Sequence, residues 1–366
     1  MAVYPFILEP ILKRRIWGGC RLESRLKKRL PPGELIGESW EVADLENDQS
    51  IVAVGAEKGK TLGQLFRLWG ADLLGRAKLI DGRFPLLIKF LDASQPLSVQ
   101  VHPSQAAARR LGGRVRIKNE AWYVIEAEPK AWILRGLCEG VDEAALREAI
   151  GAGRVESVLN RIPARPGHAY YLPSGTVHAL GPGVLVAEVQ TPSDVTYRLH
   201  DWDRVDPTTG QPRELHIDDA LASLRFDAPP AEAEHPQHVA SVWTSITSLV
   251  RSESFVIERV RMVEGVELPI TYEELVIWIV LEGSGSVTWK GMGDPLTFGV
   301  GDTVVLPAAL KEGRVKVHER TMWLEVSLPI ESSLAGFDRP DRLTLREPPG
   351  QGFVPLNLPR EDATPP

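Results

Sequence analysis

Short apolar runs separated by proline and glycine recur along the whole chain. The first part of the chain holds the runs SWEVAD, IVAV, PLLIKFLDA, LSVQVH, EAWYVIEA, AWILRGL, AYYLP and VLVAEVQ. Runs of this kind, bounded by turn residues, are typical of strands. The 29 prolines and 32 glycines are spread throughout, and this spread favours an all-β barrel or sandwich over a helical or doubly wound fold.

Helical periodicity is confined to a few short segments, so the sequence predicts a mostly β fold with few helices. Residues 61–75 begin with Thr61, three positions before a glutamine, which is the spacing of a capping box, and their apolar residues form one stripe. Residues 142–150 predict a second helix with Asp142 as its N-cap. Residues 104–111 predict a third, shorter helix.

A change of composition divides the chain into two β regions. Residues 227–238, DAPPAEAEHPQH, are rich in Pro, Ala and Glu and lack any periodicity, so they predict a linker. The linker separates a first domain, residues 1–226, from a second β domain, residues 239–335, whose apolar runs are again joined by glycine turns. Residues 336–366 are expected to form a C-terminal strap or tail.

Composition describes an ordinary globular chain and argues against several partners. The chain has 366 residues, which at roughly 150 residues per domain gives two or three domains. Its net charge of −7 argues against a nucleic-acid partner. Two cysteines, Cys20 and Cys138, are too few for a disulfide framework and fit a reducing compartment. No apolar run approaches the roughly 20 residues of a membrane span, and charges interrupt the N-terminal stretch. We therefore predict a cytoplasmic protein without a membrane partner.

Candidate chemistry first appears in the segment PLSVQVHPSQ, residues 96–105. Its residues alternate as in a strand, so the two valines face one way, whereas Ser98, Gln100 and His102 face the other. A proline then ends the strand. If the valines pack against a neighbouring layer, the polar face must line a hydrated or ligand-binding space.

Two further segments offer partners for these polar residues. His178 follows a turn in YYLPSGTVHAL, and Glu120 lies in IKNEAWYVIEA. Two imidazoles, a carboxylate and an amide oxygen form a plausible ligand set for Zn²⁺ or a similar divalent ion, and three strong ligands with an open position are typical of a catalytic site. The alternative is that His102 and His178 are core histidines hydrogen-bonded to neighbours, and alternation by itself leaves both interpretations open.

The order and spacing of several blocks resemble those of the type I mannose-6-phosphate isomerases of the cupin superfamily, in their compact bacterial form. These blocks are RRIWGG, GESWEVAD, PLLIKFLDASQPLSVQVHPS, KNEAWYVI, YYLPSGTVHAL, EVQTPSDVTYRLHDWDR and RELH. The resemblance implies two cupin-like (jelly-roll) β-barrels, the second without metal. It also implies one Zn²⁺ per chain, with Gln100, His102, Glu120 and His178 as ligands.

The same resemblance implies an aldose–ketose isomerase that interconverts mannose 6-phosphate and fructose 6-phosphate through a cis-enediol intermediate. Glu188 and Asp194 are both candidates for the base, and the sequence does not choose between them. Glu188 alternates inward on an apolar strand, where desolvation is expected to raise the pKa of a lone carboxyl. Arg198 keeps its proton at neutral pH, so it suits the stabilisation of negative charge. A structural Glu188–Arg198 pair is the alternative.

Three more polar side chains complete the expected pocket. Lys118 shares a strand face with Glu120 and is the remaining expected catalytic residue. Lys89 and Ser98 are expected to form the substrate-binding wall. Each assignment has a structural alternative: Lys118 as a solvated surface lysine, for example, or Asp194 as the residue that holds its loop through an Asx turn.

A second class of function is a non-catalytic sugar or sugar-phosphate sensor on the same barrel. A sensor would bind its ligand tightly without turnover, and it has less need of both Arg198 and a full metal-ligand set. A cupin dioxygenase would need a redox metal and an H-x-H pair, so Gln100 argues against it. The expected partner is therefore a small-molecule sugar phosphate, and the sequence predicts no oligomeric state.

Overall fold

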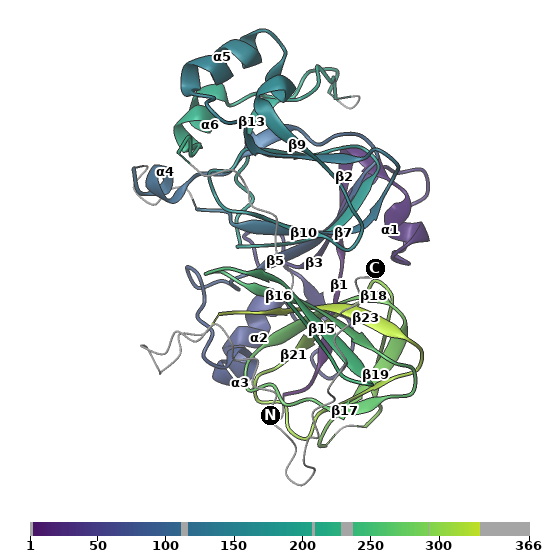
Figure 1. Cartoon of the computed structure of the whole chain (residues 1–366). Coiled ribbons are helices and arrows are strands. Elements are labelled where there is room, and N and C mark those ends of the chain that lie inside the picture. Colours follow the sequence, from purple (N-terminus) through teal and green to yellow (C-terminus); the bar gives the residue numbers. More distant parts are fainter. Residues whose placement is uncertain (1–2, 111–115, 207–208, 228–236, 292, 330–366) are drawn as a thin grey trace, which may run out of the picture. The chain divides into compact units, whose positions relative to one another are not determined.

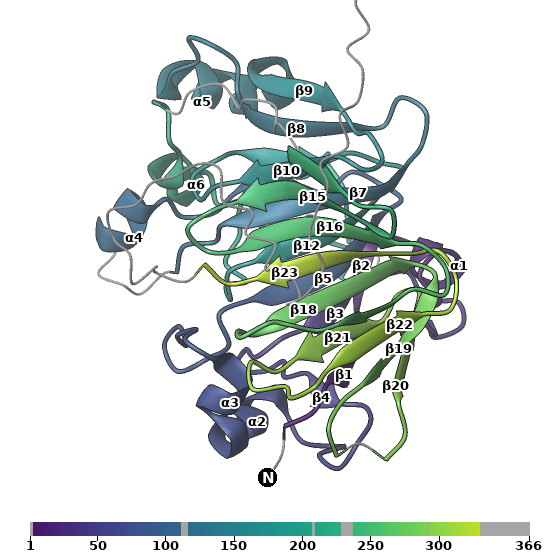
Figure 2. The same ribbon diagram turned by 60° about the horizontal axis from the view of Figure 1, so that its bottom comes forward.

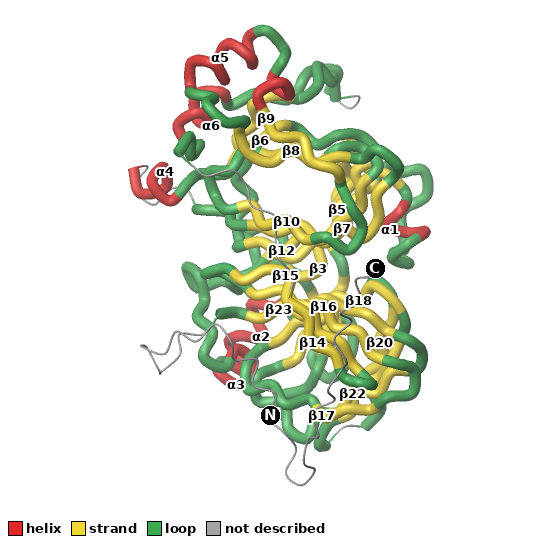
Figure 3. The backbone as a smooth tube through the Cα atoms, viewed as in Figure 1, coloured by secondary structure: helices red, strands yellow, loops and turns green. Residues whose placement is uncertain are grey.

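Four antiparallel sheets make up the computed structural model, which describes residues 3–110, 116–206, 209–227, 237–291 and 293–329 (Figure 1). The sheets are stacked in layers, and the few helices are short (Figures 1 and 3). This architecture confirms the mostly β fold predicted from the sequence. None of the four sheets closes on itself within the described residues, so the two predicted barrels are not confirmed.

Two of the sheets come from the first part of the chain. The six-stranded sheet consists, in spatial order, of β10 (Ala169–Leu172), β7 (Glu120–Ala127), β12 (Val184–Gln190), β5 (Leu87–Ala93), β3 (Ile36–Val42) and β2 (Ile11–Gly19). The five-stranded sheet consists of β13 (Tyr197–His200), β6 (Val99–Val101), β11 (His178–Leu180), β8 (Trp132–Leu137) and β9 (Leu159–Pro163).

The other two sheets come mainly from the second part. The eight-stranded sheet consists of β14 (Gln237–Ala240), β15 (Thr244–Arg251), β16 (Val256–Met262), β23 (Thr321–Ser327), β18 (Val276–Glu282), β21 (Thr303–Leu306), β1 (Phe6–Glu9) and β4 (Ile51–Val52). The four-stranded sheet consists of β17 (Glu267–Pro269), β22 (Arg314–Val317), β19 (Ser284–Thr288) and β20 (Leu296–Gly299). Phe6 pairs with Val305, so the N-terminal strand lies in a sheet built mainly from the second part of the chain.

The three helical segments predicted from the sequence are present, together with two short helices and a 3₁₀ turn that were not predicted. They are α1 (Arg21–Ser24), α2 (Leu62–Trp69), α3 (Ala71–Leu74), α4 (Gln105–Arg110), α5 (Glu143–Gly151), α6 (Ile217–Ser223) and the 3₁₀ turn η1 (Val155–Val158). The capping box at Thr61 is formed, and the Asp142 side chain accepts a hydrogen bond from the Ala145 backbone. The single helix predicted over 61–75 is divided, because Gly70 has a φ of 48° and a helix needs a negative φ.

Apolar side chains fill the spaces between the layers. The core between the five- and six-stranded sheets includes Leu91, Trp122, Ile133, Leu180 and Val186. The core between the six- and eight-stranded sheets includes Phe6, Phe90, Tyr123, Ile277 and Leu324, and it continues to α2 and α3. The core between the eight- and four-stranded sheets includes Trp278, Val287, Phe298, Val315 and Trp323. Figure 2 shows α2 and α3 near β1 and β4, with α5 and α6 at the opposite end.

The polar face of the strand at residues 98–102 is the feature that positions the site. Val99 and Val101 are fully buried against α5 and α6 on one side of the five-stranded sheet. Ser98, Gln100 and His102 therefore face the six-stranded sheet, as the alternation predicts.

The described residues all belong to one compact unit. Most of the predicted linker, residues 228–236, and the whole predicted tail, residues 336–366, lie outside the described residues. The division into domains at 1–226 and 239–335 therefore stays a prediction. In the part of the chain that the structure describes, no helix has both the length and the apolarity needed to cross a membrane.

A carboxyl group lies inside the aromatic core of the second part of the chain. Glu325 accepts hydrogen bonds from Tyr272, from Trp278 Nε1 at 3.2 Å and from Trp323 Nε1 at 3.5 Å. Burial raises the pKa of Glu325 from 4.5 to about 7, and the nearby Glu258 adds to this effect, although the three hydrogen bonds oppose it.

The raised pKa of Glu325 predicts a pH-dependent stability. The folded chain holds the Glu325 proton more tightly than the unfolded chain, so this contribution to stability is complete below pH 4.5 and is lost as the pH rises to about 7. We expect the free energy of unfolding of Glu325→Gln to exceed that of the wild type by up to about 3 kcal/mol at pH 8 and to differ little from it at pH 4.5. Urea unfolding across this pH range measures the effect. The exposed Glu312→Gln should show no such trend, and an equal effect of Glu325→Gln at both pH values would contradict the explanation.

Candidate active site

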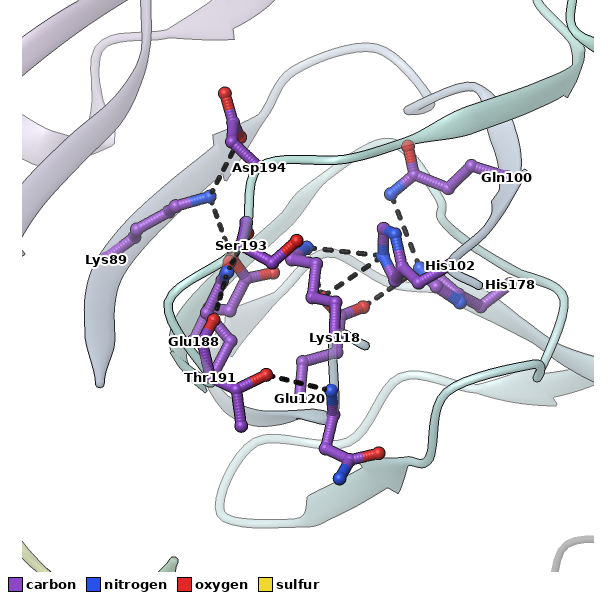
Figure 4. A network of polar contacts seen from close by, with 12 residues as sticks. Lys89, Gln100, His102, Lys118, Glu120, His178, Glu188, Thr191, Ser193 and Asp194 are labelled. Atoms are coloured by element: carbon purple, nitrogen blue, oxygen red, sulfur yellow. Dashed lines mark hydrogen bonds and ion pairs between the residues drawn. The ribbon is translucent and has the colours of Figure 1, made fainter. Parts of the chain in front are cut away.

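Three buried side chains from separate strands converge at one end of the space between the five- and six-stranded sheets. His102 follows β6, Glu120 begins β7 and His178 begins β11. The potential ligand atoms of all three lie within 4.8 Å of one another, and each residue is at most 1% exposed. His178 Nε2 lies 2.9 Å from one Glu120 oxygen, and His102 Nε2 lies 3.4 Å from the other (Figure 4).

The hydrogen bonds of the two rings decide which nitrogen faces the centre of this group. His102 Nδ1 lies 2.7 Å from the Val195 carbonyl oxygen, and His178 Nδ1 lies 2.9 Å from that of Thr176. Because a carbonyl oxygen only accepts, each Nδ1 donates, and in the neutral ring Nε2 then presents a lone pair. Burial lowers the pKa of His102 to about 3, with the Lys118 charge adding to this effect, so its ring is neutral.

Two lone pairs directed at a carboxylate require a cation or a proton between them. This is the donor arrangement that a divalent ion needs, with second hydrogen bonds that fix each ring, so the residues fit a metal. Oε1 of Glu120 is buried and has no hydrogen-bond partner in the described part of the chain. Burial opposes ionisation of Glu120, but Lys118 and the two histidines keep the pKa of this carboxyl well below its usual value.

Gln100 and Lys118 complete the polar group. Gln100 pairs with His178 in the sheet, and its amide nitrogen lies 3.3 Å from His178 Nε2. A half turn of the amide would place its oxygen at the same point. The Lys118 ammonium contacts the Glu120 carboxylate and lies 3.2 Å from His102 Nε2. Burial lowers the pKa of Lys118, but the charges of Glu120 and Glu188 outweigh it and raise the pKa above its usual value. Lys118 is therefore not the solvated surface lysine of the alternative interpretation.

The turn before His178 is fixed by a glycine. Gly175 has a φ of +88°, and a Cβ at this position would lie 2.8 Å from Ser104 Cβ. A side chain here would therefore be strained by both conformation and contact. The Gly175 N–H donates to the His102 carbonyl at 2.9 Å, so the turn before His178 is tied to His102, another metal-ligand candidate.

A pocket of about 640 Å³ adjoins this group, a size that suits a small-molecule ligand. Seven of the ten site residues predicted from the sequence line it, namely Lys89, Ser98, Gln100, Lys118, Glu188, Asp194 and Arg198. The other three are His102, Glu120 and His178, which contact Gln100 or Lys118. The structure therefore brings all ten predicted residues into one region.

Lys89 lies between the two candidates for the base. Its ammonium is 3.3 Å from Glu188 Oε1 and 3.9 Å from Asp194 Oδ1. Glu188 is buried and accepts a hydrogen bond of 2.8 Å from Trp122 Nε1, whereas the side chain of Asp194 is 57% exposed. Glu188 is therefore not a lone carboxylate among apolar neighbours, and its ion-pair partner is Lys89, not Arg198.

Arg198 lies on the same wall as Gln100, since the two residues are paired in the sheet. Its Nη1 donates to the Glu214 carbonyl at 2.8 Å, and its Nε is buried without a hydrogen-bond partner among the described residues. Burial lowers the pKa of Arg198, and the nearby Arg213 lowers it further. The group remains a cation at neutral pH.

Sequence reasoning missed the wall of the pocket that comes from β2 and β3, and one residue beyond β13. Arg14 and Arg15 of β2 line the pocket, and Arg15 binds Glu38 at 2.6 Å. Arg213 lines it as well. The blocks RRIWGG, GESWEVAD and RELH contain all of these residues, but nothing in their local pattern shows that they face one another.

Comparison with known proteins agrees with these observations. The family model "Phosphomannose isomerase type I, catalytic domain" matches residues 6–129. The mannose-6-phosphate isomerase of Streptococcus mutans is 36% identical over 312 residues, which cover 84% of this chain and 93% of that protein. Mannose-6-phosphate isomerase ManA of Bacillus subtilis is 35% identical over 317 residues, covering 86% and 97% of the two chains.

A solved structure extends the likeness to the fold. The crystal structure of the mannose 6-phosphate isomerase from Bacillus subtilis matches with a TM-score of 0.79 and 33% identity, and the match covers 88% of this chain and 99% of that one. Identity at this level over nearly the whole length of several relatives establishes common descent. The chain therefore belongs to the type I phosphomannose isomerase family, as its sequence motifs predict.

Proposed function

We propose that this protein is a metal-dependent aldose–ketose isomerase that interconverts mannose 6-phosphate and fructose 6-phosphate through a cis-enediol intermediate. The observation that carries the proposal is the convergence of His102, Glu120 and His178 beside a pocket lined by both cations and carboxylates. The names of the relatives support the same reaction. A sugar sensor is not favoured, because binding alone does not need this combination of groups.

The metal is proposed to be one Zn²⁺ per chain, held by His102, Glu120, His178 and the amide oxygen of Gln100. The mixed nitrogen and oxygen donors suit a borderline ion. Bound there, Zn²⁺ would polarise the oxygens of the sugar without any redox change. The fixed rings of His102 and His178 would hold the ligand geometry constant while substrate enters and leaves.

The remaining chemistry is proposed for the chain's own side chains. A carboxylate, Glu188 or Asp194, would move the proton between C1 and C2, and the Lys89 ammonium would hold both carboxylates at the pocket wall. Lys118 would stabilise the negative charge that develops on the sugar oxygens, and Arg198 would stabilise this charge or the phosphate of the substrate. Ser98, whose hydroxyl lies 3.4 Å from Gln100 Oε1, would bind a sugar hydroxyl.

The fold and location also belong to the proposal. The five- and six-stranded sheets face each other across one core, and the eight- and four-stranded sheets across another. We propose that each pair corresponds to a cupin-like jelly-roll barrel, that the second carries no metal, and that the protein acts in the cytoplasm.

Removal of the metal is expected to abolish the reaction. Wild-type protein should convert mannose 6-phosphate to fructose 6-phosphate in a coupled assay, and dialysis against a chelator should lower kcat by at least about a hundredfold, because the developing charge would lose its electrophile. Adding Zn²⁺ back should restore the rate, with metal content measured in the same samples. Full activity in a sample shown to be free of metal would refute metal dependence, and no turnover of any hexose phosphate with metal bound would refute the isomerase.

A further inference from the structure

A hairpin that follows β13 carries several charged residues to the edge of the pocket. Val205 and Pro212 are paired across it. Two side chains anchor it to the segment that precedes β6, since Trp202 Nε1 donates to the Leu97 carbonyl at 2.7 Å and Arg204 Nη1 donates to the Pro96 carbonyl at 2.6 Å. These contacts hold Trp202 and Arg204 against the segment that leads into β6.

One carboxylate at the base of the hairpin binds two guanidinium groups. Asp201 accepts a hydrogen bond of 2.8 Å from Arg213 Nε and a second from Arg213 Nη2, and it also accepts from Arg204 Nη2. All three nitrogens of Arg204 donate to oxygens of Asp201 or Pro96. Nη1 of Arg213, in contrast, donates to no described residue, and Arg213 lines the pocket.

Arg198 is a third guanidinium group near Arg204 and Arg213, and it forms no ion pair with a carboxylate in the described part of the chain. Its Nη1 donates to a backbone carbonyl, and its buried Nε has no hydrogen-bond partner among the described residues. Glu214, another acidic group whose charge acts on Arg198, has a side chain that is 82% exposed. Arg198, Arg204 and Arg213 thus lie around one buried carboxylate, Asp201.

The other cations that line the pocket have carboxylate partners. Arg14 binds Glu34 and Arg15 binds Glu38. Lys89 and Lys118 have the partners described above, Glu188 and Glu120. Asp206 also lines the pocket. Arg213, in contrast, shares its carboxylate, Asp201, with Arg204, and Arg198 forms no ion pair with a described residue.

We propose that Arg213, oriented by Asp201, binds the phosphate group of the substrate, next to Arg198. A phosphate monoester carries up to two negative charges and three acceptor oxygens, so it matches two guanidinium groups with free donors. Because Arg198 is paired with Gln100, the phosphate would lie on the same wall as the metal-ligand candidates, and the sugar would extend from one to the other. This inference rests on the proposed function in one respect, the sugar phosphate as substrate.

The first test measures phosphate binding directly. By titration calorimetry, wild-type protein loaded with Zn²⁺ should bind inorganic phosphate and glycerol phosphate, and Arg213→Met should bind both at least about tenfold more weakly, the loss expected for one charge-assisted contact. KM for the sugar phosphate should rise by a similar factor, with a smaller change in kcat, and Arg213→Lys should recover part of the affinity. Equal phosphate affinity in wild type and Arg213→Met would overturn the inference.

Arg147→Met is a matched control, since Arg147 also pairs with an aspartate, Asp218, but lies outside the pocket lining. It should bind phosphate like the wild type. Metal content and thermal unfolding, measured for each variant, identify any variant that has lost metal or fold. If Arg213→Met does not fold, the conservative Arg213→Lys takes its place, and unchanged phosphate affinity and KM in this folded variant would overturn the inference.

A second variant separates orientation from charge. Asp201→Asn removes the negative charge beside Arg213, so electrostatics alone would predict tighter binding of phosphate. If Asp201 acts by orienting Arg213, the loss of the two-point contact should weaken phosphate binding instead, by about threefold or more. Tighter binding in Asp201→Asn would refute the positioning role.

The outcome for phosphate is independent of the outcome for isomerisation. Wild-type turnover together with unchanged phosphate affinity in Arg213→Met would leave the isomerase in place and reject this site. Phosphate binding that depends on Arg213, without turnover of mannose 6-phosphate, would support the site and reject the proposed reaction.

Discussion

His102→Ala is expected to abolish activity and to reduce bound metal sharply, with kcat/KM lower by at least about a thousandfold. His102 Nε2 is one of the two imidazole nitrogens directed at Glu120, and no other imidazole is positioned to replace it in the described residues. Its loss leaves one nitrogen ligand beside a carboxylate, which is a poor site for Zn²⁺. Metal analysis of purified protein and a coupled isomerase assay give the two readings.

A control separates the loss of a ligand from the loss of a buried side chain. His318 lies in the second part of the chain, where its ring contacts Ser286 Oγ at 3.2 Å, so His318→Ala should keep wild-type metal content and activity. Thermal unfolding of His102→Ala in the presence of chelator should resemble that of chelated wild type. Wild-type metal content in a folded His102→Ala variant would remove His102 from the ligand set.

Periodicity in the sequence predicts the face on which each site residue lies. The alternation at residues 98–102 places Gln100 and His102 opposite two valines, and the structure has this arrangement. Glu188 and Lys118 are also directed to the pocket as expected. These predictions succeed because side-chain direction in a strand depends only on local geometry.

The partners of those residues could not be predicted in the same way. Glu188 is paired with Lys89 because β12 and β5 are neighbours in the register observed, whereas the structural alternative considered from the sequence was a pair with Arg198. The order of strands in a sheet depends on contacts between distant segments, and no local pattern encodes it. The same reason explains why the wall formed by Arg15 and Glu38 was missed, since it belongs to a strand pair at the far edge of the six-stranded sheet.

The motifs of the family supply what periodicity cannot. Four ligand candidates from three separated segments have no common spacing, and the sequence pattern alone leaves core histidines as an equal alternative. The structure adds the orientation of the rings, with both Nδ1 atoms bound to carbonyl oxygens and both Nε2 atoms directed at Glu120. This orientation is a physical reason for a cation that does not depend on the resemblance.

Glu188→Gln is expected to lower kcat by about a thousandfold, and Asp194→Asn by less than about tenfold, which would identify Glu188 as the base. Glu188 is buried and held by Trp122, and its Oε1 has no hydrogen-bond partner among the residues that the structure describes, although Lys89 lies 3.3 Å away. A carboxylate that is fixed and shielded from water suits proton transfer better than one that is 57% exposed, as Asp194 is.

The substitution Glu188→Gln is chosen because its amide oxygen can still accept from Trp122 Nε1, so KM and metal content should change little. The rate of exchange of the transferred hydrogen with solvent deuterium, followed by NMR, should fall in parallel with kcat, because both depend on the same base. If Asp194→Asn instead shows the larger loss in both measurements, the roles are reversed: Asp194 moves the proton, and Glu188 serves to hold Lys89 at the pocket wall.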